Sequence, residues 1–362
     1  MNLISNNIYI QSLGCFLISI SISFITTPFL IKLGKRFNYL DYPSGRKKHK
    51  QEIVNIGGIS IFLGIFLTII PLYMLIKIDL IQISNNIFNI IPILFLINLI
   101  IFFTGLYDDK FSLSPSIRLT IQLISASLMW LMGLRIELLD LTFLFPNIDL
   151  FQLPLFLNYL VTIIWIAGIT NAINWLDGMD GLAAGVSLLI AFGMLLIGFN
   201  VSNNLAVIFC SLLIGSCLGF LFFNFKPAKI IMGDSGSNLL GFSLAITNIL
   251  LLRGDQTLGV LPFSLILFFV PILDMLRVIF IRIWNKNSPF QADRNHLHFK
   301  LLKKNFSEGK VIFIIYNMVL ISISISFQIF NFKLALPLFF ISFFALLILI
   351  FKKDSKTFIA EK

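Results

Sequence analysis

The chain has 362 residues, of which 58% are hydrophobic and only 12% are charged. Soluble domains carry about 25% charged residues, so this composition excludes an ordinary water-soluble protein and predicts an all-α, polytopic helical membrane protein. The formal net charge of +10 comes without a separate soluble domain, which argues against nucleic-acid binding.

Apolar runs long enough to cross a bilayer recur along the whole chain. A helix of about 17–25 apolar residues spans the hydrocarbon core, and eleven such runs indicate a single integral membrane domain over residues 1–362. The predicted spans are 8–31, 56–76, 87–106, 117–134, 155–173, 182–199, 204–223, 236–252, 260–283, 311–330 and 334–351.

Lysine and arginine are distributed unevenly between the connections. Of the 27 basic residues, the even-numbered connections hold only Lys77, Arg135, Arg253 and Lys333. Basic loops stay in the cytoplasm, so the odd-numbered connections and the C-terminus are predicted to be cytoplasmic and the N-terminus to lie outside. We expect a multi-pass protein of the inner (plasma) membrane.

Five segments rich in polar residues all fall in predicted cytoplasmic connections. Unrelated polar loops would seldom share one side, so this pattern predicts one active site that faces the cytoplasm. The expected catalytic loops are about 32–55, 107–118, 170–185, 224–241 and 284–310.

The first two of these loops carry a basic cluster and an acidic pair. Lys48 and His49 belong to the basic cluster, whose charge is explained equally by topology and by substrate binding. Asp108 and Asp109 are adjacent, and two neighbouring carboxylates repel unless one is protonated or a cation lies between them. They suit a general base or a ligand of Mg²⁺; the alternative is a solvated pair at a helix end.

The third loop contains the sequence NAINWLDGMDGLAAG, from Asn171 to Gly185. A carboxylate near hydrocarbon costs several kcal/mol unless it is solvated or paired. Asn174, Asp177 and Asp180 are three residues apart, which would place them on one face of a helix. The segment therefore predicts a metal and phosphate site at the end of a membrane bundle.

The fourth loop contains GDSGS, residues 233–237. Small residues expose backbone N–H groups, and the next span is expected to start near Ser237, so its N-terminus would favour an anion. Asp234 would repel phosphate unless it held a cation, so we assign it to Mg²⁺.

In the fifth loop, His296 and His298 flank Leu297 and follow Arg294. The two imidazoles would share a side in an extended chain and diverge in a helix. A zinc site needs three or four ligands, and His49 is the only other histidine. The pair is better suited to holding phosphate oxygens, with an ordinary surface loop as the alternative.

These motifs, in this order, resemble the polyprenyl-phosphate N-acetylhexosamine-1-phosphate transferases over about residues 41–304. The resemblance implies ten or eleven spans and transfer of a sugar-1-phosphate from a UDP-N-acetylhexosamine to a polyprenyl (undecaprenyl) phosphate lipid, releasing UMP. It implies Mg²⁺, which Mn²⁺ can replace, and leaves a homodimer open. Such a reaction is the first membrane step of cell-envelope glycan synthesis.

The resemblance also implies roles for single residues. Asp108 and Asp109 fall near the lipid phosphate, with one as the base, and Asp177 and Asp180 fall near the nucleotide as catalytic acids. The other matching positions are Asn174 and Asp234 for the metal and pyrophosphate, Arg118 and Asn171 for substrate, and Arg294, His296 and His298 on a loop that closes over nucleotide and phosphate.

The chain departs from the family pattern at a few positions. Phe299 replaces the last histidine of the usual HLHH, and the HHH of muramoyl-pentapeptide transferases is absent. This favours the branch that uses UDP-GlcNAc. Glu52 and Val54 replace two prolines of the first loop, which affects the shape expected for that loop.

Several alternatives stay open. The sugar can be GalNAc, QuiNAc, FucNAc or MurNAc-pentapeptide instead of GlcNAc, and transfer can be direct or proceed through an aspartyl-phosphate. A secondary transporter would place its charges near the bilayer midplane within repeats, and no repeat is visible. A CDP-alcohol phosphotransferase would need Ala-Arg after Asp177-Gly178, and this sequence lacks it.

Overall fold

The computed structural model describes residues 7–41, 52–77, 90–139, 151–252, 260–291, 293–330 and 332–351. These residues are mostly helical, and they form two compact units, Met1–Pro262 and Phe263–Lys362.

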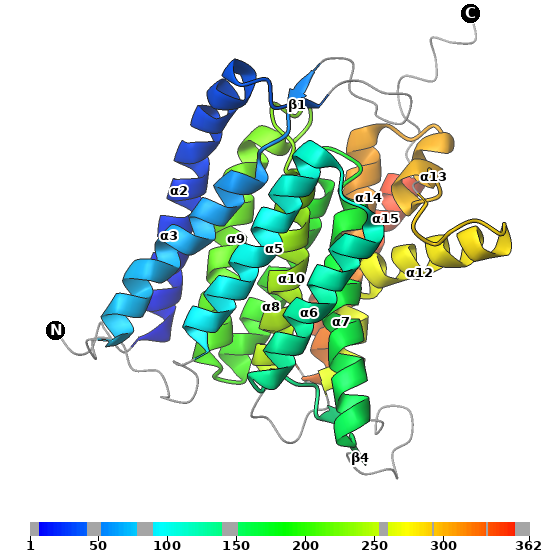
Figure 1. The fold of residues 1–362 in the computed structure, drawn as a ribbon. Helices are drawn as coiled ribbons and strands as arrows, with labels where there is room; N and C mark the ends of the chain where they lie inside the picture. The colour runs from blue at the N-terminus through cyan, green and yellow to red at the C-terminus, as the bar shows by residue number, and fades with distance from the viewer. Residues whose placement is uncertain are drawn as a thin grey trace, which may run out of the picture. The chain divides into compact units, whose positions relative to one another are not determined.

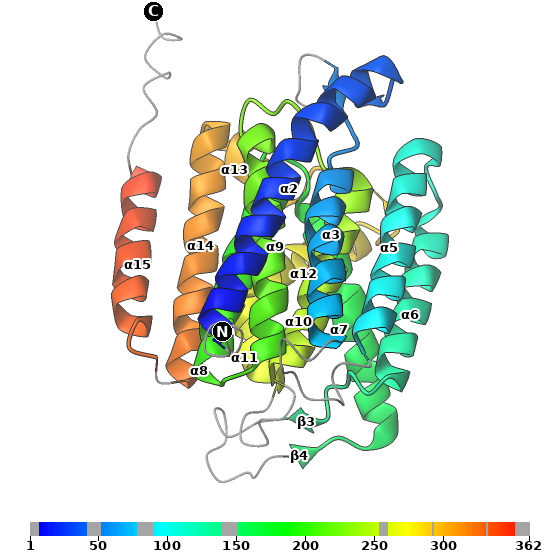
Figure 2. The ribbon, with the colours of Figure 1, turned by 90° about the vertical axis from the view of Figure 1, so that its left-hand side faces the viewer.

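Long helices that pack side by side make up the first unit (Figures 1 and 2). They are α2 (Ile8–Arg36), α3 (Gly58–Lys77), α5 (Ile91–Phe111), α6 (Pro115–Leu131), α7 (Leu155–Leu176), α8 (Leu182–Asn200), α9 (Asn204–Asn224) and α10 (Gly233–Leu252). Helix α10 is the central one, because it contacts α3, α5, α7, α8 and α9 and its side chains are almost all buried. The sequence boundary between the two units, after Pro262, falls within α11 (Val260–Leu267).

The connections of this unit contain two short pairs of antiparallel strands. These are β1 (Leu40–Asp41) with β2 (Ile53–Val54), and β3 (Leu138–Leu139) with β4 (Phe151–Gln152). The chain after β2 also runs beside the segment that leads into α10. The N–H of Ile231 donates to the carbonyl of Val54, and the N–H of Gly58 donates to that of Met232, both at 2.9 Å. The first polar connection is thereby held against the start of α10.

The second unit contains α12 (Phe269–Trp284), α13 (Leu297–Lys303), α14 (Glu308–Ile329) and α15 (Ala335–Phe351). Helix α14 contacts the other three. The short helix α13 carries His298 and begins directly after His296, which is its N-cap residue.

The described part of each of the eleven predicted spans is largely helical, although the ninth is divided at Phe268 into α11 and α12. Among the described residues, six helices are long and apolar enough to cross a membrane: Ile8–Arg36, Ile91–Phe111, Leu155–Leu176, Leu182–Asn200, Asn204–Asn224 and Glu308–Ile329. Gly58–Met74 and Ala335–Phe351 are shorter apolar helices. An all-α, multi-pass membrane protein is confirmed, while the count of eleven spans and the orientation stay predictions.

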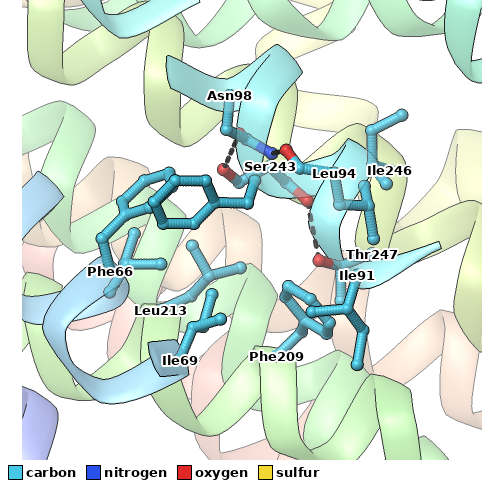
Figure 3. A pocket seen from close by; sticks show the side chains of 12 residues that line it. Phe66, Ile69, Ile91, Leu94, Asn98, Phe209, Leu213, Ser243, Ile246 and Thr247 are labelled. Atoms are coloured by element: carbon cyan, nitrogen blue, oxygen red, sulfur yellow. Dashed lines mark hydrogen bonds between the residues drawn. The ribbon is translucent and has the colours of Figure 1, made fainter. Parts of the chain in front are cut away.

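A small, mainly apolar cavity of about 20 Å³ lies between α3, α5, α9 and α10 (Figure 3). One edge is polar, because the Ser243 hydroxyl donates to Oδ1 of Asn98 at 2.8 Å and Asn98 Nδ2 donates to the Leu94 carbonyl at 2.9 Å. Asn98 is only 7% exposed, so these bonds satisfy its amide inside the bundle. The bond between Ser243 and Asn98 also joins α10 to α5 inside the bundle.

Candidate active site

The C-terminal end of α5 meets the N-terminal end of α10 through Asp109. Its Oδ1 accepts the backbone N–H of Asp234 at 2.7 Å, and its Oδ2 accepts that of Ser235 at 3.1 Å. A helix N-terminus favours an anion because its first N–H groups lack helical partners. The anion at this N-terminus is therefore a carboxylate of the chain itself.

The start of α10 differs from the sequence-based expectation. The helix begins at Gly233, whose φ of +69° is left-handed, and not near Ser237. A Cβ at Gly233 would lie 2.5 Å from Oδ1 of Asp109, so only glycine fits this turn. GDSGS is the first turn of the helix rather than a loop before it.

Asp108 points to a different set of donors from its neighbour Asp109. Its Oδ1 accepts the backbone N–H of Leu113 at 2.6 Å, and its Oδ2 lies 2.7 Å from Nη1 of Arg118. The same Nη1 lies 3.6 Å from Oδ2 of Asp234. The two adjacent acids thus face different donors: Arg118 and the Leu113 N–H for Asp108, and two N–H groups of α10 for Asp109.

Asn174 and Asp234, which the resemblance assigned to the same role, are in direct contact. Asn174 Nδ2 donates to Oδ1 of Asp234 at 2.5 Å and to the Ser237 hydroxyl at 2.8 Å. The side chain of Asp234 keeps 32% of its surface exposed. Asp234 is therefore reached from α6 by Arg118 and from α7 by Asn174, while part of it faces outward.

Asp177 and Asp180 do not share a helix face, so that expectation was wrong. Helix α7 ends at Leu176, Asp177 is its C-cap residue, and Asp180 lies in the turn before α8. Oδ2 of Asp180 accepts the backbone N–H of Ala228 at 3.0 Å, which links this turn to the segment before α10.

Asp177 has a strongly perturbed acidity. Burial is the main cause that raises its pKa well above 3.8, and the negative charges of Asp234, Asp109 and Asp180 raise it further. The shift indicates that the carboxylates of the first unit's polar end influence one another, as they would in a site that binds a cation.

Asn171 belongs to a series of hydrogen-bonded side-chain amides that leads to the backbone of Asp234. Its Nδ2 donates to Oε1 of Gln122 at 2.6 Å, Gln122 Nε2 donates to Oδ1 of Asn238 at 3.2 Å, and Asn238 Nδ2 donates to the carbonyl of Asp234 at 2.8 Å. Sequence reasoning missed Gln122 and Asn238, although an amide inside an apolar run is a usable signal. The assignment of Asn171 to substrate stays a prediction.

In the second unit, His296 and His298 stack on each other, with ring centroids 5.6 Å apart and planes at 10°. They are 7% and 0% exposed, so the surface-loop alternative is wrong. Phe299, at the place of the usual last histidine, packs on the His298 ring at 4.2 Å. Arg294 is exposed.

Sequence reasoning also missed four charged residues of this unit: Asp274, Arg277, Arg282 and Asp293. The Asp274 carboxylate lies 2.8 Å from Nδ1 of His296 and 3.3 Å from Nη2 of Arg277, and Arg282 Nε lies 3.0 Å from Asp293. An acid within the ninth apolar run was the available signal, since ionisable residues in membrane helices are expected to serve a function.

Lys48 and His49 lie outside the described residues. Over the described ranges, no three histidine, cysteine or acidic side chains converge to hold a metal. Mg²⁺ needs only one or two carboxylates when waters and substrate phosphates complete its shell, so the outward side of Asp234 fits such an ion, and Mg²⁺ stays a prediction.

Comparison with known proteins identifies the family of this chain. The family model described as glycosyl transferase family 4 matches residues 90–252. A probable undecaprenyl-phosphate N-acetylglucosaminyl 1-phosphate transferase of Bacillus subtilis is 33% identical over 307 residues, covering 85% of this chain and 82% of that protein. An undecaprenyl-phosphate alpha-N-acetylglucosaminyl 1-phosphate transferase of Escherichia coli K12 is 30% identical over 82% of this chain and 78% of its own. A decaprenyl-phosphate N-acetylglucosaminephosphotransferase of Mycobacterium leprae is similar at 30% identity, over 82% and 78%. The chain therefore belongs to glycosyl transferase family 4, together with these polyprenyl-phosphate sugar transferases.

Proposed function

We propose that the protein transfers N-acetylglucosamine-1-phosphate from UDP-GlcNAc to polyprenyl (undecaprenyl) phosphate and releases UMP, as the first membrane step of a cell-envelope glycan. The observation that carries the proposal is the junction at the start of α10, where Asp109 and Asn174 both bond to Asp234 or its backbone. These are the positions that the family resemblance assigns to the lipid phosphate, the metal and the pyrophosphate.

Charge balance supports a cation as cofactor. The polar end of the first unit gathers the acids Asp108, Asp109, Asp177, Asp180 and Asp234. Among the described residues, Arg118 ion-pairs with two of them. Both substrates are anions, so additional positive charge is needed before they can meet. Mg²⁺, or Mn²⁺ in its place, would be held by Asp234 and Asn174 and would neutralise the pyrophosphate.

The reaction balances as a direct displacement. An oxygen of the lipid phosphate forms a bond to the sugar-linked phosphorus, and the bond from that phosphorus to the bridging oxygen breaks, so UMP leaves with the electron pair. Both carboxylate oxygens of Asp109 accept backbone N–H groups, and both of Asp108 accept N–H donors. This supports a role in binding and proton transfer rather than as a covalent nucleophile. Protein that becomes labelled by β-phosphorus-labelled UDP-GlcNAc without lipid would contradict direct transfer.

We further propose eleven spans in the inner membrane, with the N-terminus outside and the active site cytoplasmic. The three native cysteines are buried, so single cysteines introduced at Lys333 and Lys304 can report sidedness. An impermeant thiol reagent should label the first in intact cells and the second only after the membrane is opened. The reverse pattern would overturn the orientation.

The decisive assay uses purified protein, polyprenyl phosphate, Mg²⁺ and a panel of UDP-sugars. UMP should be released with UDP-GlcNAc. Release only with the GalNAc, QuiNAc, FucNAc or MurNAc-pentapeptide donor would replace the sugar but keep the reaction. If no donor gave UMP, the proposed enzyme activity would be refuted, and transport would be the next function to test. The mass of the detergent complex in the same preparation decides whether the enzyme is a homodimer.

A further inference from the structure

The second unit contains a histidine whose ring is held by a buried carboxylate. Asp274, on α12, is 4% exposed, and its Oδ2 lies 2.8 Å from Nδ1 of His296. Its Oδ1 accepts the backbone N–H of Leu297 at 2.6 Å. One carboxylate therefore holds both the imidazole and the first backbone N–H of α13.

This contact decides how His296 is presented. A carboxylate at Nδ1 favours the tautomer with its proton on that nitrogen and fixes the rotation of the ring. Nε2 is then set on the opposite edge, as an acceptor when the ring is neutral and a donor when it is protonated. The ring of His298, stacked at 5.6 Å, limits movement from one side.

The chain around His296 is held by the same helix. Arg277, one turn after Asp274, pairs with it and donates to the carbonyl of Asn295. Further along α12, Arg282 pairs with Asp293, which also accepts the backbone N–H of Asn295 at 3.0 Å. The two arginines of α12 thus contact the following segment at Pro289, Asp293 and Asn295.

A buried carboxylate at position 274 is expected to have a specific role, because burying it costs free energy. An acid within an apolar membrane run is expensive unless it is paired, and the helix could be packed by an apolar side chain. Its buried carboxylate has three donors, from His296, Leu297 and Arg277.

We infer that Asp274 is a positioning residue of the reaction: it orients the imidazole of His296 through Nδ1 so that this histidine can serve a phosphate group of the substrates. The inference rests on the proposed function, because the role of His296 is to bind a phosphate group in that reaction. Asp274 itself touches no substrate in this scheme and acts through His296 alone.

A double-mutant cycle on kcat/KM tests this. Asp274→Asn and His296→Ala should each lower kcat/KM by on the order of 10–100-fold, as loss of an orienting partner does at other sites. The double variant should be within about twofold of His296→Ala, because the inferred effect of Asp274 on the reaction passes through the imidazole and not through its contacts with Leu297 and Arg277. Asp274→Glu, which keeps the carboxylate, should recover part of the activity that Asp274→Asn loses.

Asp293→Asn is the matched control. This variant also removes a carboxylate that is paired with an arginine of α12. Among the described residues, Asp293 is hydrogen-bonded to Arg282 and Asn295 and not to a histidine ring. Combined with His296→Ala, its effect should multiply. Thermal unfolding in detergent confirms that each variant is folded.

The two hypotheses fail in different ways. Wild-type turnover combined with multiplicative losses for Asp274→Asn and His296→Ala overturns the positioning role and leaves the proposed function standing. Wild-type kcat/KM in Asp274→Asn does the same. Wild-type protein that releases no UMP with any donor overturns the proposed function, and the inference with it.

Discussion

Asp109 accepts the backbone N–H of Asp234 at 2.7 Å, so two acids that lie 125 positions apart are joined through one helix N-terminus. The bond runs from the side chain of one to the main chain of the other. Asp109 thereby fixes where α10 begins and where the Asp234 side chain leaves the helix. Removing it should change the site through geometry as well as through charge.

Asp109→Ala should lower both stability and activity. Loss of a capping acceptor costs about 0.5–2 kcal/mol, and the released start of α10 carries Asp234 with it. Asp109→Asn keeps one acceptor oxygen, so it should unfold at a higher temperature than Asp109→Ala while still losing turnover. Thermal unfolding in detergent and UMP release measure the two effects. The exposed Glu137→Gln is the control, and an unchanged Tm in Asp109→Ala would refute the capping role.

Gly105→Ala should disturb the same junction from the α5 side. Its Cβ would lie 2.5 Å from the carbonyl oxygen of Asp234 and 2.6 Å from Cα of Ser235. Backbone cannot yield as a flexible side chain can, so we expect a loss of about 1–3 kcal/mol together with a large loss of activity. Gly168→Ala, on α7, is the matched control because nothing lies within 4 Å of its added Cβ. It should be neutral or stabilising; equal behaviour of the two variants would show that α5 and α10 are not closely packed.

Asp234→Asn and Asn174→Asp should change the dependence of turnover on Mg²⁺ in different ways. The first removes the carboxylate assigned to the ion, so no Mg²⁺ concentration should restore turnover. The second places a carboxylate against Oδ1 of Asp234, where Asn174 now donates at 2.5 Å. That repulsion should lower activity at low Mg²⁺ and be partly relieved at high Mg²⁺. A titration of UMP release against Mg²⁺ measures both, and wild-type Mg²⁺ dependence in Asp234→Asn would refute the metal assignment.

Asp293 should stabilise the fold in a pH-dependent way. Burial alone would raise its pKa, but hydrogen bonds from Arg282 and Asn295 outweigh burial and lower the pKa from 3.8 to about 2. A depressed acid pKa contributes stability above the unfolded value, and the contribution is lost as pH falls through the folded value, here from roughly pH 4 to pH 2. The Tm difference between wild type and Asp293→Asn should therefore be largest near neutral pH and shrink in that window. A difference that grew with acid would contradict the ion pair.

Much of the helical pattern could be predicted, because hydrocarbon length and apolar composition dictate it. The described part of each apolar run is largely helical. The acids of the first unit also converge as expected, since Asp108, Asp234 and Asn174 meet through Arg118 and direct contact.

What could not be predicted depended on contacts between distant segments. The end of α7 at Leu176 removed the expected stripe through Asp177 and Asp180. The cap on α10 is Asp109, which no local pattern links to Gly233. Asp274 lies within a predicted apolar span, and only its contact with His296 in the structure indicates a functional role.

The hydrogen bond between Ser243 and Asn98 has a consequence for any exchange of parts between related chains. Helices α5 and α10 are joined twice, at this bond inside the bundle and at Asp109 beside Asp234. A single inserted or deleted residue between Asn98 and Asp109 would rotate one attachment by about 100° relative to the other. A chimera between related chains must therefore take α5 and α10 from the same parent and keep the number of residues between Asn98 and Asp109.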